Sequence, residues 1–266
     1  MSRFVLDIVI CMANTQVTVV FWNIWEQVQS GRRDDGSKLQ AKFDHFIKAY
    51  DPDVFGLNEV LVHRQTNASP VLDYFKKQGY KTHFAPFSPM SDQWMIGSAL
   101  VTKQKPTKIV DHRLGPDTQA NKARGYQGYH VKAIEAHLRF GGEDVAIVVN
   151  YLAALFFMNW STHVKHRRTY EKLLESVAHK SVIIGGDFNE TKYMAPWLRM
   201  PQHLGRRTGS LRNPTWRWNG QKWRIALANY DNILWTKHGE LHLEEFNVLP
   251  RSPSDHSPLL GVFIIK

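Results

Sequence analysis

Residues 183–189 read Ile-Ile-Gly-Gly-Asp-Phe-Asn, a short apolar run that ends in two glycines, a carboxylate and an amide. Apolar runs of this length that are bounded by turn residues are typical of buried strands. Asp187 and Asn189 stand two positions apart, so their side chains share one face if the chain is extended there. The stretch therefore predicts a strand that delivers polar side chains to the edge of a sheet.

Short apolar runs of the same kind recur along the whole chain. They predict strands at 17–21, 54–57, 96–101, 145–149, 182–184, 232–235 and 259–265. Apolar residues at helical spacing predict a helix across 39–47, which Asp51 and Pro52 would stop, and a second helix from Ser161 or Thr162 to about His179. Clusters of turn residues predict long loops at 84–92, 115–128 and 201–223. Strands and helices are therefore interleaved, as in an α/β fold.

The domain organisation follows from what the chain lacks. Because no repeat and no Gly-, Ser- or Pro-rich linker divides it, we expect one domain over 17–266 with residues 1–16 as an N-terminal extension. The extension resembles a weak signal peptide, but Asp7 interrupts its apolar stretch and no small-residue cleavage pattern follows. A cytoplasmic protein is therefore expected, with secretion as the alternative. No apolar run reaches the ~18 residues that span a bilayer, so no stable membrane insertion is expected.

Composition excludes several classes of protein. Of 266 residues, 43% are hydrophobic and 22% are charged, which fits a folded domain and not a disordered chain. The single cysteine, Cys11, excludes an internal disulfide framework and any CxxC zinc or redox site. A formal net charge of +10 favours an anionic partner such as nucleic acid or a phosphate ester, and the alternative explanation is solubility alone.

Polar residues gather where the predicted strands end. Each of them alone is equally typical of a turn or a helix cap. Together, carboxylates, amides and one histidine at strand ends predict a site for a hard cation with an acid or base nearby, and oxygen ligands without cysteine favour Mg²⁺ or Mn²⁺ over Zn²⁺. The residues concerned are Asn23, Glu59, Asp187, Asn189, Asp231, Asp255 and His256.

Four short motifs that contain these residues, taken in chain order, resemble those of a known family. They are Trp-Asn-Ile at 22–24, Leu-Asn-Glu-Val at 57–60, Gly-Gly-Asp-Phe-Asn at 185–189 and Ser-Asp-His-Ser-Pro at 254–258. In this order they resemble the endonuclease/exonuclease/phosphatase superfamily, over nearly the whole chain. The resemblance implies an α/β fold of the type I deoxyribonuclease kind, a four-layer sandwich in which two mainly antiparallel sheets pack face to face and are flanked by helices. It also implies a metal-dependent phosphoesterase.

The resemblance assigns a role to each polar residue. It implies that Glu59 is the principal Mg²⁺ ligand, assisted by Asn23 and Asp255. It implies that His256 is the catalytic histidine and that Asp231 holds the imidazole ring.

In the same family pattern, Asp187 orients or deprotonates the attacking water and Asn189 positions that water with the phosphate. Water would then attack the phosphorus in line, without a covalent enzyme intermediate.

The sequence departs from the common family pattern at two positions. Many members have Thr-His-Leu at the end of a strand, where the histidine contacts phosphate; this chain has Tyr151 there, as in the apurinic endonuclease branch. The resemblance therefore implies a catalytic role for Tyr151, and the alternative is a half-buried strand aromatic. Where the common form is Arg-Ile-Asp, this chain has Asn229-Tyr230-Asp231, which leaves the local phosphate contacts in doubt, although Arg224 lies close in sequence.

The segment 205–224 interleaves arginine and lysine with tryptophan. Guanidinium groups pair with phosphates and indole rings stack on bases, so this mixture is typical of nucleic-acid contacts. Within it we single out Arg217, Trp218 and Arg224 as substrate-binding candidates, and we add Arg124 from a separate loop. Trp216, which precedes the Asp231 motif, is expected to pack as core.

We therefore expect a nuclease that cleaves as an endonuclease and acts as a monomer on DNA more than on RNA. The alternative is a phosphatase or phosphodiesterase acting on an inositol-phosphate, a sphingomyelin-like lipid or another small phosphoester, with the apolar stretch 152–160 facing a membrane. A catalytically inactive binding module is disfavoured because every acid, amide and histidine that the chemistry requires is present.

Overall fold

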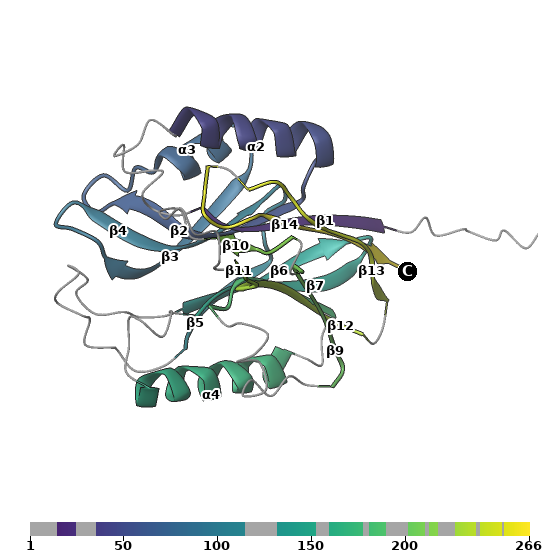
Figure 1. The fold of residues 1–266 in the computed structure, drawn as a ribbon. Helices are drawn as coiled ribbons and strands as arrows, with labels where there is room; N and C mark the ends of the chain where they lie inside the picture. The colour runs from purple at the N-terminus through teal and green to yellow at the C-terminus, as the bar shows by residue number, and fades with distance from the viewer. Residues whose placement is uncertain are drawn as a thin grey trace, which may run out of the picture.

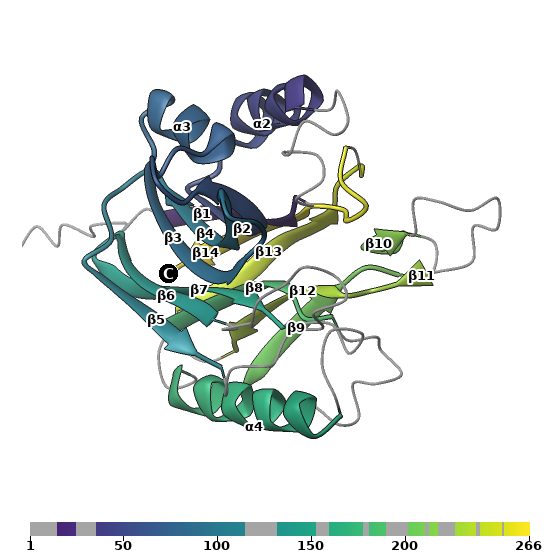
Figure 2. The same ribbon diagram turned by 90° about the vertical axis from the view of Figure 1, so that its left-hand side faces the viewer.

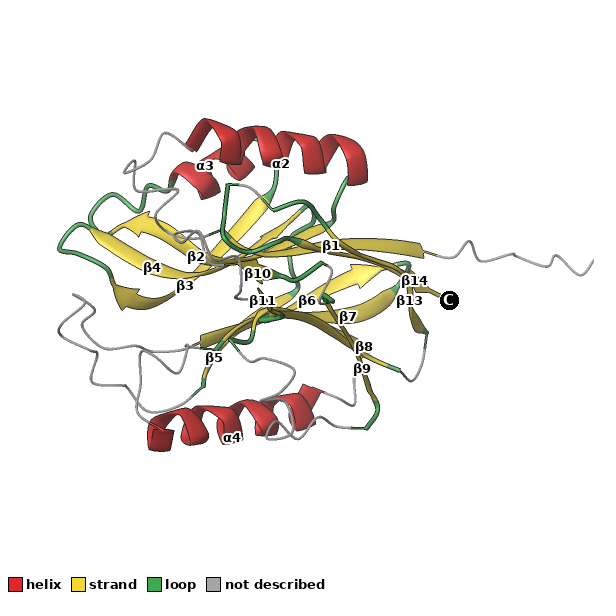
Figure 3. Cartoon of the chain, viewed as in Figure 1, coloured by secondary structure: helices red, strands yellow, loops and turns green. Residues whose placement is uncertain are grey.

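Two sheets form the middle of the molecule and helices cover both outer faces (Figures 1 and 3). The structure is a computed structural model that describes residues 15–24, 36–114, 132–152, 160–177, 181–189, 202–210, 213–217, 227–237, 240–251 and 253–266. The four layers are the sandwich that the family resemblance implied, so the expected fold class is confirmed.

The first sheet has six strands, in the order β13-β14-β1-β2-β4-β3. Their bounds are Leu241–Val248 for β13, Leu259–Ile265 for β14, Thr15–Asn23 for β1, Val54–His63 for β2, Trp94–Thr102 for β4 and Lys81–Pro89 for β3. Only β1 and β2 are parallel, and the other neighbours are antiparallel. Because β1 and β2 are parallel, they end at the same edge of the sheet.

The second sheet also has six strands, in the order β5-β6-β7-β8-β12-β9. Their bounds are Lys108–Arg113 for β5, Lys132–Phe140 for β6, Glu143–Tyr151 for β7, Ser181–Asp187 for β8, Asp231–Thr236 for β12 and Leu204–Thr208 for β9. Here β7 and β8 are the parallel pair. A two-stranded ribbon of β10 (Trp216–Arg217) and β11 (Leu227–Ala228) projects beside this sheet (Figure 2).

In the described part of the chain, three helices lie outside the sheets. Figure 2 shows α2 (Gly36–Tyr50) and α3 (Pro70–Lys77) over the first sheet and α4 (Trp160–Val177) over the second. Helix α3, which the sequence reading missed, begins where Ser69 caps it: Ser69 Oγ accepts a hydrogen bond from the Leu72 amide, and Pro70 occupies the first turn. Helix α4 is part of the connection from β7 to β8. Two parallel strands need such a crossover segment between them.

Phe21 sets the distance between the two sheets. Its ring leaves β1 toward the second sheet and lies against Gly56 and Gly185. A Cβ atom on Gly185 would stand 2.1 Å from the ring, and one on Gly56 would stand 2.4 Å from it. Both positions therefore require glycine because the ring fills the space that a side chain would need.

Two of the expected loops contain strands. Most of 84–92 belongs to β3, and 201–223 contains β9 and β10. The prolines caused the first error, because Pro86 and Pro89 suggested a loop. They are tolerated here since β3 is an edge strand with a bulge between Pro86 and Ser88. The third expected loop, 115–128, lies outside the described residues.

The N-terminal boundary keeps its status as a prediction. Strand β1 begins at Thr15, and residues 1–14 lie outside the described part of the chain. Within the described residues, no helix combines the length and the hydropathy that crossing a membrane demands.

Replacing Gly185 with alanine tests the packing of the two sheets. The added methyl group overlaps the Phe21 ring, so we expect Gly185→Ala to lower the free energy of unfolding in urea by at least about 3 kcal/mol. Gly142→Ala is the matched control: it has a φ of 95° but nothing within 4 Å of the new methyl group. Only the backbone cost of about 1 to 2 kcal/mol applies there. A loss at Gly185 no larger than at Gly142 would contradict the contact.

Candidate active site

The strand order brings the polar strand ends to one edge of the sandwich. Asn23 ends β1 beside Asn58 of β2. In the other sheet, Asp187 ends β8 beside Tyr151 of β7, and Asp231 begins β12 opposite Asp187. The two parallel pairs and the antiparallel β12 therefore place carboxylates and amides from both sheets at the same end.

Asn23 connects the two sheets chemically. Its side chain is fully buried, and its Nδ2 donates to Glu59 Oε1 at 2.9 Å and to Asp187 Oδ2 at 3.0 Å. One amide therefore holds a carboxylate of the first sheet and a carboxylate of the second in fixed positions.

Glu59 lies in an irregular part of β2. The pairing of β2 with β4 shifts between Leu57 and Val60, and Glu59 has a φ of 60°. A bulge with a positive φ redirects a side chain out of the regular alternation of a strand, at a cost of about 1 to 3 kcal/mol for a residue other than glycine. Strain of this kind at a half-buried carboxylate favours a functional role.

Asn58 is a site residue that the sequence analysis missed, although it stands inside the Leu-Asn-Glu motif. Its buried Oδ1 accepts a hydrogen bond from the Asp187 backbone N–H at 3.0 Å, and its Nδ2 donates to Ser98 Oγ at 2.8 Å.

Gly186 has a φ of 132°, and a Cβ atom there would stand 2.1 Å from the Asn150 carbonyl oxygen. Both positions before Asp187 therefore require glycine: Gly185 because of the Phe21 ring, and Gly186 because of its positive φ and the nearby Asn150 carbonyl oxygen.

Asp187 and Asn189 form a closed turn at the end of β8. The Asn189 N–H donates to Asp187 Oδ1 at 2.7 Å, and Asn189 Nδ2 donates to Asp187 Oδ2 at 3.0 Å and to the Leu152 carbonyl oxygen at 2.6 Å. Asn189 has a φ of 47°, a conformation that asparagine tolerates better than most residues. The expected proximity of these two side chains is therefore present.

His256 and Asp231 form a buried pair. His256 Nδ1 lies 2.8 Å from Asp231 Oδ2, while His256 Nε2 lies 3.8 Å from Asp187 Oδ2 and 4.0 Å from Asp255 Oδ1. The loop before the histidine is fixed by Ser254, whose Oγ donates to the Asn23 carbonyl oxygen at 2.7 Å and accepts from the His256 N–H at 3.0 Å. The ring thus turns one nitrogen to Asp231 and the other toward Asp187.

Burial and neighbouring charges shift the pKa values of these groups. Burial raises the pKa of Asp187 to about 7, and the positive charge of His256 opposes that rise. Burial alone would lower the pKa of His256, but the carboxylates of Asp231 and Asp187 raise it well above its usual range. Asp187 therefore lies close to a protonation equilibrium near neutral pH, and His256 is positively charged there.

Two sets of residues could hold a divalent cation. Among the described residues, Asp187, Asp231 and His256 form the one group of acids and histidines whose ligating atoms all lie within 4.8 Å of one another. In this group, however, His256 Nδ1 is already engaged by Asp231 Oδ2, and Asp187 lies 3.8 Å from the other ring nitrogen. The second set is the one that the family resemblance implied, Glu59, Asn23 and Asp255.

The contacts of Asp255 favour the second set as the cation site. Its Oδ2 accepts from Trp216 Nε1 at 3.1 Å, while its buried Oδ1 has no hydrogen-bond partner among the described residues. Burial raises the pKa of Asp255, the positive charge of His256 opposes that rise, and the negative charge of Glu59 adds to it. Two carboxylates that repel each other, one with an unsatisfied oxygen, are the donors that Mg²⁺ or Mn²⁺ would neutralise.

Three aromatic residues line the site. Tyr151 donates its hydroxyl to Glu59 Oε1 at 3.5 Å, a long contact, and its ring stacks on Phe87 with 4.6 Å between centroids and 5° between planes. Trp216 packs on Tyr230 at 5.1 Å, and Tyr230 lies 6.5 Å from the His256 ring. The expectation that Trp216 is core was therefore incomplete, because its indole N–H holds Asp255. Tyr230 was missed because the family comparison drew attention only to Asn229.

The described part of the structure does not show where the side chains of the predicted substrate-binding residues lie. Arg124, Trp218 and Arg224 lie outside the described residues, and Arg217 is described only as part of β10. Their roles stay predictions.

Glycine at position 59 tests the strain in β2. Glu59→Ala and Glu59→Gly both remove the carboxylate, but only alanine keeps a Cβ atom at a φ of 60°. We expect the glycine variant to have the higher free energy of unfolding in urea, by about 1 kcal/mol. The reverse order of stability would show that the left-handed backbone at Glu59 is not strained in solution.

Comparisons with known proteins agree with the fold. A search of curated proteins gives no significant sequence match. Among solved structures, an endonuclease/exonuclease/phosphatase family protein from Leptotrichia buccalis superposes with a TM-score of 0.68 at 14% identity, covering 92% of this chain and 98% of its own. The D. rerio TDP2 complexed with single strand DNA product gives 0.66 at 15% identity, over 93% and 98% of the two chains. The human Nocturnin catalytic domain with bound sulfate anion gives 0.62 at 22% identity, over 95% and 94%.

At these identities the structural likeness shows the fold alone. The sequence evidence is independent of it: the model of the endonuclease/exonuclease/phosphatase family matches residues 20–256, which include every strand-end residue of the candidate site. The chain therefore belongs to the endonuclease/exonuclease/phosphatase family.

Proposed function

We propose that this protein is a Mg²⁺- or Mn²⁺-dependent phosphoesterase that hydrolyses phosphodiester bonds of nucleic acid, with DNA preferred to RNA. Members of its family are hydrolases that act on phosphoesters. The observation that carries the proposal is the meeting of a His–Asp pair with Asp187 at 3.8 Å, beside the separate carboxylates of Glu59 and Asp255. The first group can move protons, and the second can hold a cation.

Glu59, Asn23 and Asp255 would hold the metal ion. When bound there, Mg²⁺ or Mn²⁺ neutralises negative charge on a phosphoryl oxygen. Trp216 supports this arrangement because its hydrogen bond to Asp255 Oδ2 fixes the carboxylate, while Oδ1 accepts no hydrogen bond from a described residue and lies 4.0 Å from His256 Nε2. The aromatic stack of Tyr151 on Phe87 holds the Tyr151 hydroxyl near Glu59.

His256 supplies a positive charge and a proton at Nε2. Asp231 accepts from Nδ1 and thereby fixes the orientation of the ring. Because its pKa is raised, the imidazole is protonated at neutral pH and can donate from Nε2 to a phosphate oxygen.

Asp187 is the candidate base for the attacking water. Its pKa of about 7 makes it able to accept a proton near neutral pH, and Asn23 and Asn189 restrict its carboxylate to one orientation. The Asn189 amide lies beside that carboxylate, where it can position water and phosphate together. Water that loses its proton to Asp187 would attack phosphorus, the bond from phosphorus to the leaving oxygen would break, and that oxygen would take the proton of His256 Nε2.

Charge supports nucleic acid as the substrate. The net charge of +10 favours binding to a polyanion, and the exposed edge strand β9 carries Arg207. The D. rerio TDP2 structure, which has a similar fold and is complexed with single strand DNA product, supports nucleic acid as the substrate class. Arg124, Arg217, Trp218 and Arg224 are the proposed contacts of this chain with its substrate, and a monomer is the proposed working form.

A hydrolysis panel tests the proposal. Purified protein is incubated with Mg²⁺, with Mn²⁺ or with EDTA and offered supercoiled DNA, single-stranded DNA, RNA, an inositol polyphosphate or sphingomyelin. We expect metal-dependent cleavage of DNA that EDTA abolishes. Silence on all nucleic acids, with phosphate or phosphocholine released from the small substrates, would replace the nuclease with the small-phosphoester enzyme.

Substitutions at the site test the assignment of its residues. We expect Glu59→Gln, Asp187→Asn and His256→Ala each to lower kcat on the cleaved substrate by at least about 1,000-fold, since each removes a charge or proton carrier from the reacting centre. His242→Ala is the matched control, because His242 is exposed on β13. Circular dichroism and urea unfolding establish that each variant is folded. Near-full activity in any one of the three would refute the role of that residue.

A further inference from the structure

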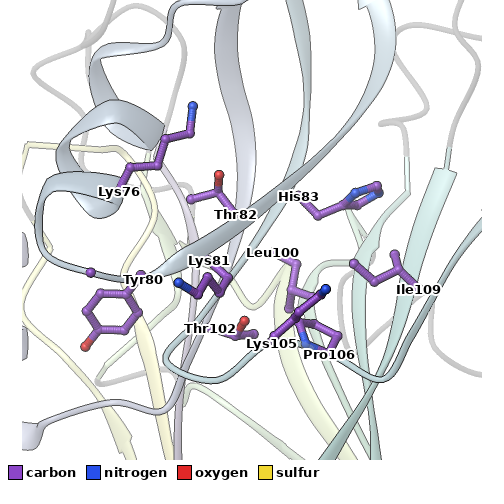
Figure 4. Close-up of a pocket in the computed structure, with 11 residues that line it drawn as sticks. Lys76, Tyr80, Lys81, Thr82, His83, Leu100, Thr102, Lys105, Pro106 and Ile109 are labelled. Atoms are coloured by element: carbon purple, nitrogen blue, oxygen red, sulfur yellow. The ribbon is translucent and has the colours of Figure 1, made fainter.

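A cavity lies at the opposite end of the sandwich from the candidate active site. It has a volume of about 530 Å³ and is lined from the end of α3, from β3 and β4, from the segment after β4 and from β5 (Figure 4). Thr102, in its wall, pairs with Val54 at the start of β2, four and five residues before Asn58 and Glu59. At ~3.3 Å per residue, the cavity is about 15 Å away from the catalytic carboxylates along the strand direction.

The edges of the two sheets meet at this cavity. Strand β3 is the edge of the first sheet and β5 is the edge of the second. His83 Nε2 of β3 and Asp111 Oδ1 of β5 lie 2.9 Å apart and join the two edges. The slot between the sheets is thus bridged by one ion pair, and the cavity occupies the space next to it.

Lysines surround the cavity. Lys76, Lys81 and Lys105 all belong to its lining, and Figure 4 shows their side chains around Thr82 and Thr102. Lys76 pairs with Asp73 at 3.1 Å, but Lys81 and Lys105 form no ion pair with any described residue. The acids near the lining are all paired: Asp73 with Lys76, Asp111 with His83, and Asp51 and Asp53 with Lys103. The cavity therefore carries net positive charge.

The interior wall of the cavity is apolar. Leu100 lies in it, and Ile109 is 38% exposed, the one large hydrophobic side chain that is exposed among the described residues. Tyr80 also belongs to the lining, although its side chain is only 7% exposed and its hydroxyl donates to the Pro52 carbonyl oxygen. The wall thus offers apolar and aromatic carbon, with its polar groups at the lysines and threonines.

We propose that this cavity is a second binding site, for an organic phosphate monoester that carries an apolar or aromatic body of about mononucleotide size. Lys81 and Lys105 bind the phosphate, and Leu100, Ile109 and the Tyr80 ring contact the body. The volume lies within the range of small-molecule sites, about 300 to 1,000 Å³, and the pairing of cationic groups with uncovered apolar surface selects a ligand with both properties. The proposal goes beyond the phosphoesterase activity and does not depend on it.

Calorimetric titration with four probes tests the proposal. The protein is kept in EDTA and titrated with AMP, hexyl phosphate, adenosine and inorganic phosphate. We expect AMP or hexyl phosphate to bind at least about tenfold more tightly than adenosine and inorganic phosphate, because each of the latter lacks one half of the recognised chemistry. AMP binding without hexyl phosphate binding identifies a nucleotide site, and the reverse identifies an alkyl phosphate site. No binding by either, or equal binding by inorganic phosphate, overturns the proposal.

Charge-neutral variants locate the binding. The double variant Lys81→Gln/Lys105→Gln should weaken the binding of the preferred probe at least about tenfold, since two charge-assisted contacts are lost. Lys165→Gln/Lys172→Gln on the exposed side of α4 removes the same charge and should leave the affinity unchanged. Unchanged affinity in the first double variant would place the probe elsewhere and overturn the proposal. Hydrolysis by Lys81→Gln/Lys105→Gln should equal that of the unaltered protein, so failure here is distinguishable from failure of the phosphoesterase proposal.

Discussion

The contact of Phe21 with Gly185 is the constraint on which the site depends. Phe21 and Asn23 stand two residues apart on β1, and Gly185 and Asp187 stand two residues apart on β8, so each pair shares a face that looks into the space between the sheets. Because Gly185 has no Cβ atom, the Phe21 ring packs directly against β8 and sets the separation of β1 and β8. Two residues further along both strands, Asn23 Nδ2 donates to Asp187 Oδ2 at 3.0 Å. A steric fit in the core therefore determines a polar distance in the site.

The site keeps strained and repelling groups that a purely structural region would not keep. Glu59 and Asn189 both have positive φ angles, and Asp187 has a pKa of about 7 because it is buried. Each feature costs stability locally, and the surrounding core offsets it. Strained backbone and perturbed carboxylates at one sheet edge are typical of catalytic sites, since a cation, a substrate or a proton can use what the folded chain holds in place.

The residues of the candidate site could be predicted because they occur in short motifs at strand ends. Asn23, Glu59, Asp187 and His256 were found in this way, and the structure brings all of them together. The residues that hold them could not be found so directly. Asn58 is read as one more polar residue of a strand until its contact with the Asp187 N–H, which is 129 residues away, is known. The roles of Trp216 and Tyr230 depend on contacts with Asp255 and His256, which are distant in the sequence and come close only in the folded chain. The edge strand β3 was missed because its prolines are tolerated only where no further strand pairs with it.

We propose that Glu59 and Asp255 hold the cation while Asp231 holds the histidine, so that the two tasks belong to different carboxylates. Direct titration of Mn²⁺, followed by the electron paramagnetic resonance of the free ion, tests it without any substrate. The account predicts that Glu59→Gln and Asp255→Asn each weaken Mn²⁺ binding at least about tenfold, whereas Asp231→Asn has a much smaller effect. Loss of Mn²⁺ binding in Asp231→Asn together with unchanged binding in Glu59→Gln would contradict the account and assign the cation to the Asp187, Asp231 and His256 group instead.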